Sequence, residues 1–279
     1  MKRKIQATGS RRRRLGQHFL EPGWVARVID TVAPEAHEHI LEIGPGHGAL
    51  TLPLAARAAR IVAVERDPAL ARGLQERVPD TVEIVEQDIL ADDLREWARR
   101  LRNHGPADAT LRLAGNLPYS ISSPILTMML RSARAAGFRD AVLMLQREVA
   151  ERVVAEPGMR DYGPLAILTM LHATARCVLQ LPPRAFRPPP KVRSTVVTLR
   201  FRDLPCGPPD PARFDAFVRR LFTRRRKQLV NALLPAEDPA NRDPAGICRA
   251  AGIDPARRPG TLSLIELMAL DAALVTAGG

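Results

Sequence analysis

The tetrapeptide Asn116-Leu117-Pro118-Tyr119 contains the residue types needed to hold a flat ring that carries an amino group. Such an aromatic amine is a poor nucleophile because its lone pair is delocalised into the ring. The side-chain carbonyl of Asn116 can accept one hydrogen bond from the amine, and the backbone carbonyl of Leu117, held by Pro118, can accept another. Tyr119 can stack on the ring. Acceptors at these places stabilise the positive charge that develops on the nitrogen, so the tetrapeptide predicts methyl transfer to an exocyclic amine of a nucleic-acid base. By residue type alone, the same four residues would also suit a turn.

A glycine-rich run upstream of the tetrapeptide is typical of a nucleoside cofactor site. Gly44, Gly46 and Gly48 fall between a predicted strand and a predicted helix. Residues without a Cβ atom let the backbone turn tightly there and approach a ligand closely. A dinucleotide fingerprint is G-x-G-x-x-G with a pyrophosphate at the helix N-terminus, whereas this chain has G-x-G-x-G and an acid, Glu42, at the strand end. That carboxylate would repel pyrophosphate but suits the amino group of a methionine moiety, which favours S-adenosylmethionine over a nicotinamide cofactor.

Two acids further along the chain fit the same cofactor. Glu65 ends the second predicted strand, 21 positions after Gly44 (65 − 44), about where an acid binds ribose hydroxyls. Asp88 follows the third predicted strand, where its carboxylate can accept a hydrogen bond from an adenine amino group. Both would pass for ordinary surface acids if the tetrapeptide were absent. With it, they predict an adenosylmethionine site.

The elements that must position these residues alternate between strand and helix patterns. Strands are predicted over residues 39–43, 61–65, 82–86, 111–115, 141–145, 174–181 and 195–201. Helices are predicted between them over residues 48–58, from 68, over 93–102 and over 124–134. This alternation predicts an α/β fold with a mostly parallel seven-stranded sheet and helices on both faces. The last two strands are expected to be antiparallel, because no crossover helix fits between them.

A small helical lobe is expected after a linker over residues 204–209. Helical patterns cover residues 214–223, 227–233, 244–251 and 262–275, and Thr261 is the predicted cap of the last helix. We therefore expect two domains: residues 1–205, which begin with a basic arm over residues 1–15, and residues 206–279.

The composition indicates a polyanionic partner. The chain has 279 residues, 46% of them hydrophobic, and a formal net charge of +12 in which Arg dominates over Lys. A core of good size is possible, and the charge favours nucleic acid as the partner, although a genome rich in G and C also raises the Arg content. The three cysteines are isolated from one another and from any histidine at ligand spacing, so no zinc site and a reducing compartment are expected. Since neither a membrane span nor a signal peptide is evident, we expect a cytoplasmic protein.

Seven motifs, in chain order, resemble those of the ribosomal RNA adenine dimethyltransferases, more particularly the bacterial small-subunit type. The motifs are Leu15-Gly16-Gln17-His18-Phe19-Leu20, the glycine loop 42–48, Gln87-Asp88, the tetrapeptide 116–119, residues 146–150, Tyr162-Gly163 and the F-x-P-x-P-x-V-x-S run over 186–194. The resemblance spans roughly residues 11 to 275. It implies a class I methyltransferase fold, S-adenosylmethionine as cofactor, and dimethylation of two adjacent adenosines in the 3′-terminal hairpin loop of 16S rRNA. A role in small-subunit biogenesis and a monomeric state are expected with it.

The resemblance also implies roles for individual residues. Residues 17–20 would close over the cofactor, with His18 and Leu20 touching it. The other cofactor contacts would come from Gly44, Gly46, Glu65, Asp88 and Asn116. Phe186 would form the second face of the base clamp, opposite Tyr119. Family members commonly carry Asn where this chain has His18, which can still donate a hydrogen bond but is bulkier.

A basic cluster in the helical C-terminal lobe is the predicted RNA-binding site. Arg224, Arg225, Arg226 and Lys227 resemble the basic motif of the family and would contact phosphates, which fix the register of the RNA rather than read its sequence. A solvated, charged start of a helix is the other interpretation of the same residues.

Three other functions remain open at this point. One is a large-subunit adenine dimethylase of the macrolide-resistance type, in which the tetrapeptide more often begins Asn-Ile-Pro. Another is a non-catalytic RNA-binding assembly factor, which the intact residues 116–119 disfavour. The third is a nicotinamide oxidoreductase.

Overall fold

The computed structural model describes residues 18–103, 108–203, 207–233 and 243–277. The chain divides into two compact units: Met1–Ala150 with Ala173–Arg202, and Glu151–His172 with Asp203–Gly279. The sequence had suggested a single boundary after residue 205, with residues 151–172 in the first domain. In the structure, Tyr162, Ala166 and Ile167 of that segment are buried in the same hydrophobic cluster as the phenylalanines of the C-terminal lobe. The chain therefore leaves the first unit, returns to it for two strands, and leaves again.

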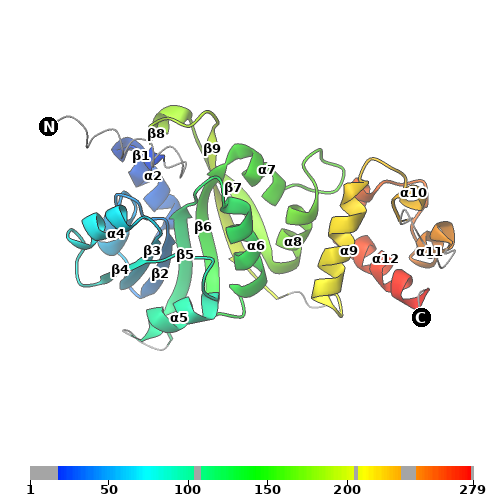
Figure 1. Cartoon of the computed structure of the whole chain (residues 1–279), viewed down its shortest axis with the longest axis horizontal. Helices are drawn as coiled ribbons and strands as arrows, with labels where there is room; N and C mark the ends of the chain where they lie inside the picture. Colours follow the sequence, from blue (N-terminus) through cyan, green and yellow to red (C-terminus); the bar gives the residue numbers. More distant parts are fainter. Residues whose placement is uncertain (1–17, 104–107, 204–206, 234–242, 278–279) are drawn as a thin grey trace. The chain divides into compact units, whose positions relative to one another are not determined.

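The first unit is built on a seven-stranded sheet (Figure 1). In spatial order its strands are β4 (Val82–Glu86), β3 (Arg60–Glu65), β2 (Glu38–Ile43), β5 (Thr110–Asn116), β6 (Phe138–Gln146), β9 (Ser194–Phe201) and β7 (Ala173–Leu181). The first five strands run parallel, and β9 is antiparallel to both β6 and β7. The predicted sheet and its antiparallel last pair are confirmed. Because the strand order reverses between β2 and β5, the crevice at the carboxyl ends of these strands is where a ligand is expected to bind.

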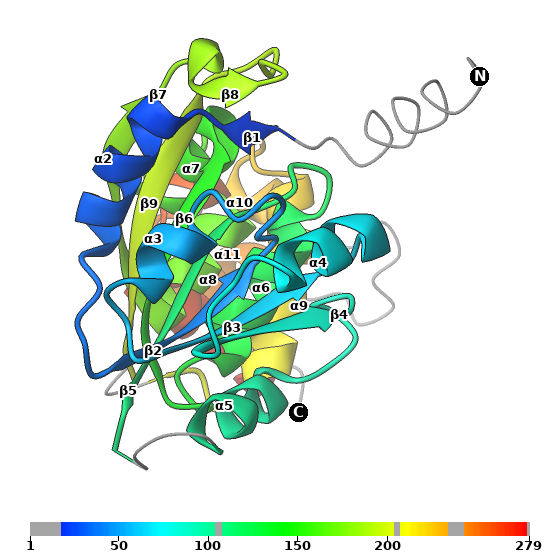
Figure 2. The same ribbon diagram turned by 90° about the vertical axis from the view of Figure 1, so that its left-hand side faces the viewer.

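Helices cover both faces of this sheet. They are α2 (Pro22–Val32), α3 (Thr51–Ala55), α4 (Pro68–Gln75), α5 (Leu94–Arg102), α6 (Ser122–Ser132) and α7 (Arg147–Val153), the last of which continues into the second unit. Apolar residues of α2 and α3 share one buried cluster with Ile40, Ile61 and Ala63 of the central strands. Helix α5 contacts β2 and β3 and lies with α6 on the opposite face (Figure 2). All six residues of β2 are buried, as expected for a parallel strand covered on both sides.

A two-stranded sheet lies beside the carboxyl ends of the main strands. It pairs β1 (Phe19–Leu20) with β8 (Phe186–Arg187), which follows a short 3₁₀ turn at Pro183–Ala185. The pairing continues past the strands, because Glu21 N donates to Ala185 O at 2.8 Å and the Arg187 guanidinium lies 2.8 Å from the Glu21 carboxylate. These contacts bring the 18–20 segment against the 186–188 segment. Strands of two residues have no detectable period, so the sequence did not predict this sheet.

The second unit consists of helices. They are α8 (Pro164–His172), α9 (Pro211–Thr223), α10 (Leu229–Leu233), α11 (Pro244–Ala250) and α12 (Leu264–Thr276), with a 3₁₀ turn at Pro259–Thr261. Tyr162 is fully buried among them and donates its hydroxyl to Leu262 O at 2.8 Å. The prediction that Thr261 caps α12 is wrong. Ser263 is the cap and forms a reciprocal capping box with Glu266, because only Ser263 is followed by an acid three residues later.

Over the described ranges, none of the helices has the length and apolarity needed to cross a membrane.

Candidate active site

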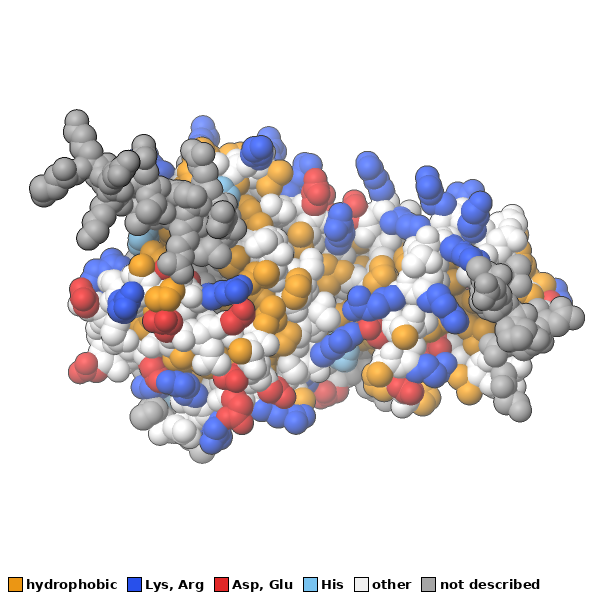
Figure 3. All heavy atoms as spheres, viewed as in Figure 1, with side chains coloured by type: hydrophobic (Ala, Val, Ile, Leu, Met, Phe, Trp, Pro, Cys, Tyr) orange, Lys and Arg blue, Asp and Glu red, His pale blue; other side chains and the backbone are white. Residues whose placement is uncertain are grey.

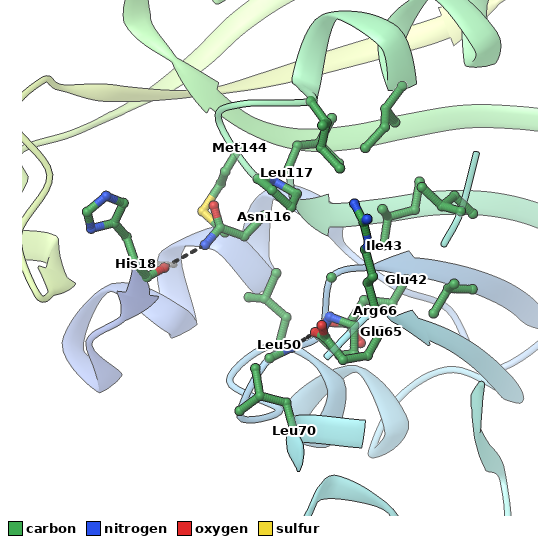
Figure 4. A pocket seen from close by; sticks show the side chains of 18 of the residues that line it. His18, Glu42, Ile43, Leu50, Glu65, Arg66, Leu70, Asn116, Leu117 and Met144 are labelled. Carbon is green, nitrogen blue, oxygen red and sulfur yellow. Dashed lines mark hydrogen bonds between the residues drawn. The ribbon is translucent and has the colours of Figure 1, made fainter. Parts of the chain in front are cut away.

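A pocket opens at the carboxyl ends of β2, β3, β4 and β5 and is bordered by β1 (Figure 4). Of the residues singled out from the sequence, its lining includes His18, Leu20, Gly44, Gly46, Glu65, Asp88, Asn116, Leu117, Pro118 and Tyr119. The structure thus brings the glycine loop, both downstream acids and the tetrapeptide together in one place. Parallel strands produce this convergence, because their carboxyl ends share one edge of the sheet.

The glycine loop after β2 is packed closely under β1. Gly46 has a φ of 58°, and a Cβ atom there would lie 3.0 Å from the Phe19 ring. Its amide donates a hydrogen bond of 3.1 Å to the Glu65 carboxylate. The Phe19 ring in turn lies 4.2 Å, centroid to centroid, from the ring of His47. A side chain at position 46 would therefore separate the loop from β1, which explains the need for glycine.

Two buried carboxylates lie at the inner end of the pocket. Glu42 is 1% exposed, and its Oε2 atom has no hydrogen-bond partner among the described residues. Burial raises the pKa of Glu42 to about 7; the Thr51 hydroxyl acts in the opposite direction, and the charge of Glu65 adds to the rise. Burial also raises the pKa of Glu65, partly offset by amide donors that include Asp67 N at 2.8 Å. Glu42 therefore offers an unpaired acceptor that a cationic group could satisfy.

Asp88 lies at the rim of the pocket and has one oxygen committed to the backbone. Its Oδ1 accepts from Leu90 N at 3.1 Å, and its Oδ2 lies 3.4 Å from the Arg66 guanidinium. Arg66 also lines the pocket, as do Ile89 and Met144. These three residues were not predicted. Arg66 directly follows Glu65 and Ile89 directly follows Asp88, so adjacency to a predicted site residue could have indicated those two, whereas Met144 lies on β6 with no such signal.

The tetrapeptide begins at the last residue of β5. Asn116 Nδ2 donates to His18 O at 2.9 Å, and Leu117 N donates to Met144 O at 3.2 Å. With its nitrogen bound to a carbonyl, the Asn116 amide has a defined orientation, and its Oδ1 is the end that remains available as an acceptor.

Tyr119 is held by its hydroxyl, which lies 2.6 Å from Ser194 Oγ. Burial raises the pKa of the Tyr119 phenol, while Ser194 lowers it, so the ring is neutral near pH 7. The His18 ring lies 5.4 Å from the Tyr119 ring at an interplanar angle of 31°. Phe186 is not part of the pocket lining; it is 2% exposed and packs in the same cluster as Leu20. Its role as the second face of the base clamp stays a prediction.

The basic cluster is in the second unit, in the turn between α9 and α10 rather than at a helix start. The Arg224 guanidinium donates to Asn231 O at 3.2 Å and that of Arg225 to Arg160 O at 2.6 Å, whereas Arg226 and Lys227 are exposed. Lys and Arg side chains gather over this unit on the face seen in Figure 3. The predicted basic arm over residues 1–15, and Gln17 of the segment expected to close over the cofactor, lie outside the described residues. Within the described part of the chain, no three His, Cys, Asp or Glu side chains group as metal ligands.

A family model for ribosomal RNA adenine dimethylase matches residues 9–269 of the chain. The chain belongs to this family. It is therefore an enzyme, an rRNA adenine dimethyltransferase. Among curated proteins, it is 44% identical over 264 residues to "Ribosomal RNA small subunit methyltransferase A" of Anaeromyxobacter dehalogenans (strain 2CP-C), which covers 93% of this chain and 92% of that protein. It is 42% identical over 269 residues to the protein of the same name in Acidobacterium capsulatum, with 94% and 91% covered.

Solved structures show the same fold. A dimethyladenosine transferase from Plasmodium falciparum superposes with a TM-score of 0.74 at 23% identity, over 94% of this chain and 98% of that one. The 23S rRNA methyltransferase ErmE superposes with a TM-score of 0.66 at 25% identity, over 92% and 99%. The predicted class I methyltransferase sheet with a small helical C-terminal part is confirmed.

Proposed function

We propose that this enzyme transfers two methyl groups from S-adenosylmethionine to the amino nitrogen of each of two adjacent adenosines in the 3′-terminal hairpin loop of 16S rRNA, during assembly of the small subunit. The observation that carries the proposal is the place of Asn116, at the end of β5 in the pocket wall with its amide nitrogen bound to His18 O. The names and identities of the curated relatives support the small subunit as substrate.

The pocket residues fit S-adenosylmethionine. The unpaired Glu42 Oε2 can accept a hydrogen bond from the ammonium group of the methionine part. Glu65, already oriented by the amides of Gly46 and Asp67, can accept from ribose hydroxyls, and Asp88 can accept from the adenine amino group. His18, which directly precedes β1, and Leu20 on β1 would also border the cofactor. Bound there, the cofactor would supply an electrophilic methyl group.

The tetrapeptide would hold the target adenine. The Asn116 side-chain carbonyl and the Leu117 backbone carbonyl would accept the two N–H bonds of the amine, and Tyr119 would stack on the ring. No strong base is needed, because the product ammonium can lose its proton to solvent. Catalysis would rest on positioning, which can contribute roughly 7–11 kcal/mol, and on stabilisation of the developing positive charge.

The same acceptors explain two transfers rather than one. After the first methyl transfer the amine retains one N–H bond, which can still bind to one of the two carbonyls. After the second it retains none, so the hydrogen bonds that hold the base are lost and the product is released.

The second unit would bind the RNA. Its exposed cations, Arg226 and Lys227 among them, would contact phosphates and so fix the register of the hairpin. Under this proposal the enzyme works as a monomer in the cytoplasm, where small subunits assemble.

Reverse transcription through the 3′-terminal hairpin tests the proposal in cells. Dimethylation removes both amino hydrogens and abolishes Watson–Crick pairing, so reverse transcriptase should stop at the hairpin in wild-type RNA. It should read through in a deletion strain and in that strain complemented with Asn116→Ala. Read-through in the wild type would overturn the proposal, and a stop in large-subunit RNA that disappears on deletion would indicate the large-subunit activity instead.

A further inference from the structure

We propose that His18 is a positioning residue for the catalytic tetrapeptide: its imidazole anchors the backbone carbonyl that orients Asn116, and the same ring lies against Tyr119. The inference rests on the proposed function, because it assigns His18 to the adenine-binding side of the pocket in addition to the cofactor side.

The first contact is between the His18 carbonyl and the Asn116 amide, at 2.9 Å. A carboxamide has a donor end and an acceptor end of nearly the same shape. If the donor end were not held, the amide could turn over and present its N–H groups to the amine, where they would repel it. The position of His18 O therefore determines whether Asn116 presents an acceptor.

The second contact fixes that carbonyl in place. His18 Nδ1 lies 2.7 Å from Pro188 O. Because a carbonyl only accepts, Nδ1 must carry the hydrogen and donate it. Over the described residues, β1 is two residues long and is paired with the two residues of β8, so this backbone pairing is weak by itself. The imidazole supplies an additional hydrogen bond at the end of β1 that faces Asn116.

The third contact is between rings. The His18 and Tyr119 rings lie 5.4 Å apart at 31°, and the Tyr119 hydroxyl is bound to Ser194 Oγ at 2.6 Å. Ser194 is fully buried as the first residue of β9. The phenol is thus held at its hydroxyl end by a rigid strand and along its ring by His18, which limits how the stacking face can turn.

A series of substitutions at position 18 separates the two side-chain functions. Asn retains a donor for Pro188 O but has no ring, Phe retains a ring beside Tyr119 but has no donor, and Ala has neither. The assay is single-turnover methylation of purified small subunits that lack the modification, at saturating S-adenosylmethionine, with the cofactor Kd measured separately by calorimetry. His37→Asn, at an exposed histidine outside the pocket, is the matched control.

We expect His18→Ala to slow single-turnover methylation by about tenfold or more, as expected for the loss of one orienting hydrogen bond. His18→Asn should recover most of the rate, His18→Phe should recover little, and His37→Asn should match the wild type. The cofactor Kd should change less than the rate across the series. Thermal unfolding of each variant shows whether it is folded. If His18→Ala does not fold, the rates of His18→Asn and His18→Phe still test the proposal.

The proposal is overturned if all three position-18 variants methylate at the wild-type rate, or if the loss appears only in the cofactor Kd. Recovery by Phe but not by Asn would overturn the anchoring role of the Pro188 contact. The wild-type rate is measured first and separates the two failures. An inactive wild-type enzyme would overturn the proposed function together with the inference that rests on it, whereas an active wild type with unaffected position-18 variants overturns only the role of His18.

Discussion

Replacing Glu42 by Gln is predicted to stabilise the ligand-free enzyme while it weakens cofactor binding. Burial raises the pKa of Glu42 from its ordinary value of 4.5 to about 7. Since one unit of pKa corresponds to about 1.4 kcal/mol, the ionised carboxylate costs the folded state on the order of 3 kcal/mol. The folded protein binds the proton more tightly than the unfolded chain does, so this group lowers the free energy of unfolding as pH rises from 4.5 to about 7, and the loss is complete above that. Gln mimics the neutral form and does not titrate.

The expected stability difference therefore depends on pH. Below about pH 5 the wild type and Glu42→Gln should unfold at similar denaturant concentrations, and at pH 8 the variant should be more stable by up to about 3 kcal/mol. Cofactor affinity should rank the two proteins in the opposite order, with the wild type binding more tightly than Glu42→Gln at pH 8. If the ammonium of S-adenosylmethionine pairs with ionised Glu42, wild-type affinity should rise by up to about tenfold per pH unit between pH 5 and 7, whereas the affinity of Glu42→Gln should be weak and nearly independent of pH.

Urea unfolding and calorimetric titration across pH 5–8 provide both readouts. Glu86→Gln, at an exposed acid at the end of β4, is the matched control and should change neither. Two results would refute the reasoning: a variant less stable than the wild type at pH 8, or wild-type cofactor affinity that does not change with pH.

Three further predictions test other parts of the site. Asn116→Ala should change cofactor affinity modestly while turnover collapses; turnover within a few-fold of the wild type would remove Asn116 from its assigned role. Arg226→Gln with Lys227→Gln should reduce the slope of log affinity against log salt for RNA by roughly one per lost phosphate contact, and an unchanged slope would place the RNA surface elsewhere. A Cβ atom on Gly115 would lie 2.4 Å from Ile43 O, so Gly115→Ala should lower the melting temperature and disrupt cofactor binding, and wild-type values for both would contradict the close packing of β2 and β5.

The fold could be predicted from the sequence where burial leaves a clear pattern. Strand β2 is buried on both faces, so its apolar residues form a short run between turns. The edge strand β4, predicted at its observed bounds of Val82–Glu86, is rich in the β-branched residues typical of strands. The parallel strands alone predicted that one pocket would bring together the glycine loop, Glu65, Asp88 and residues 116–119. The spacing of Ser263 and Glu266 also indicates a capping box, but Thr261 was predicted as the cap instead.

Other features depend on contacts between segments far apart in the chain. The β1–β8 pair is too short to show a period, so neither the hydrogen bond from Asn116 to His18 nor that from His18 to Pro188 could be anticipated. The bond between Tyr119 and Ser194 joins residues 75 positions apart. Residues 151–172 have helical and apolar character that suits either unit, and only packing against the helices of the C-terminal lobe assigns them to the second.

The most direct test of the proposed function is methylation with purified components. Small subunits that lack the modification would be incubated with the enzyme and isotopically labelled S-adenosylmethionine, and the RNA would then be digested to nucleosides and analysed by mass spectrometry. We expect N,N-dimethyladenosine that carries two labelled methyl groups, confined to two adjacent adenosines of the 3′-terminal hairpin, and no such product with Asn116→Ala. Labelling that stops at the monomethyl form, or that appears only when large-subunit RNA is supplied, would contradict the account.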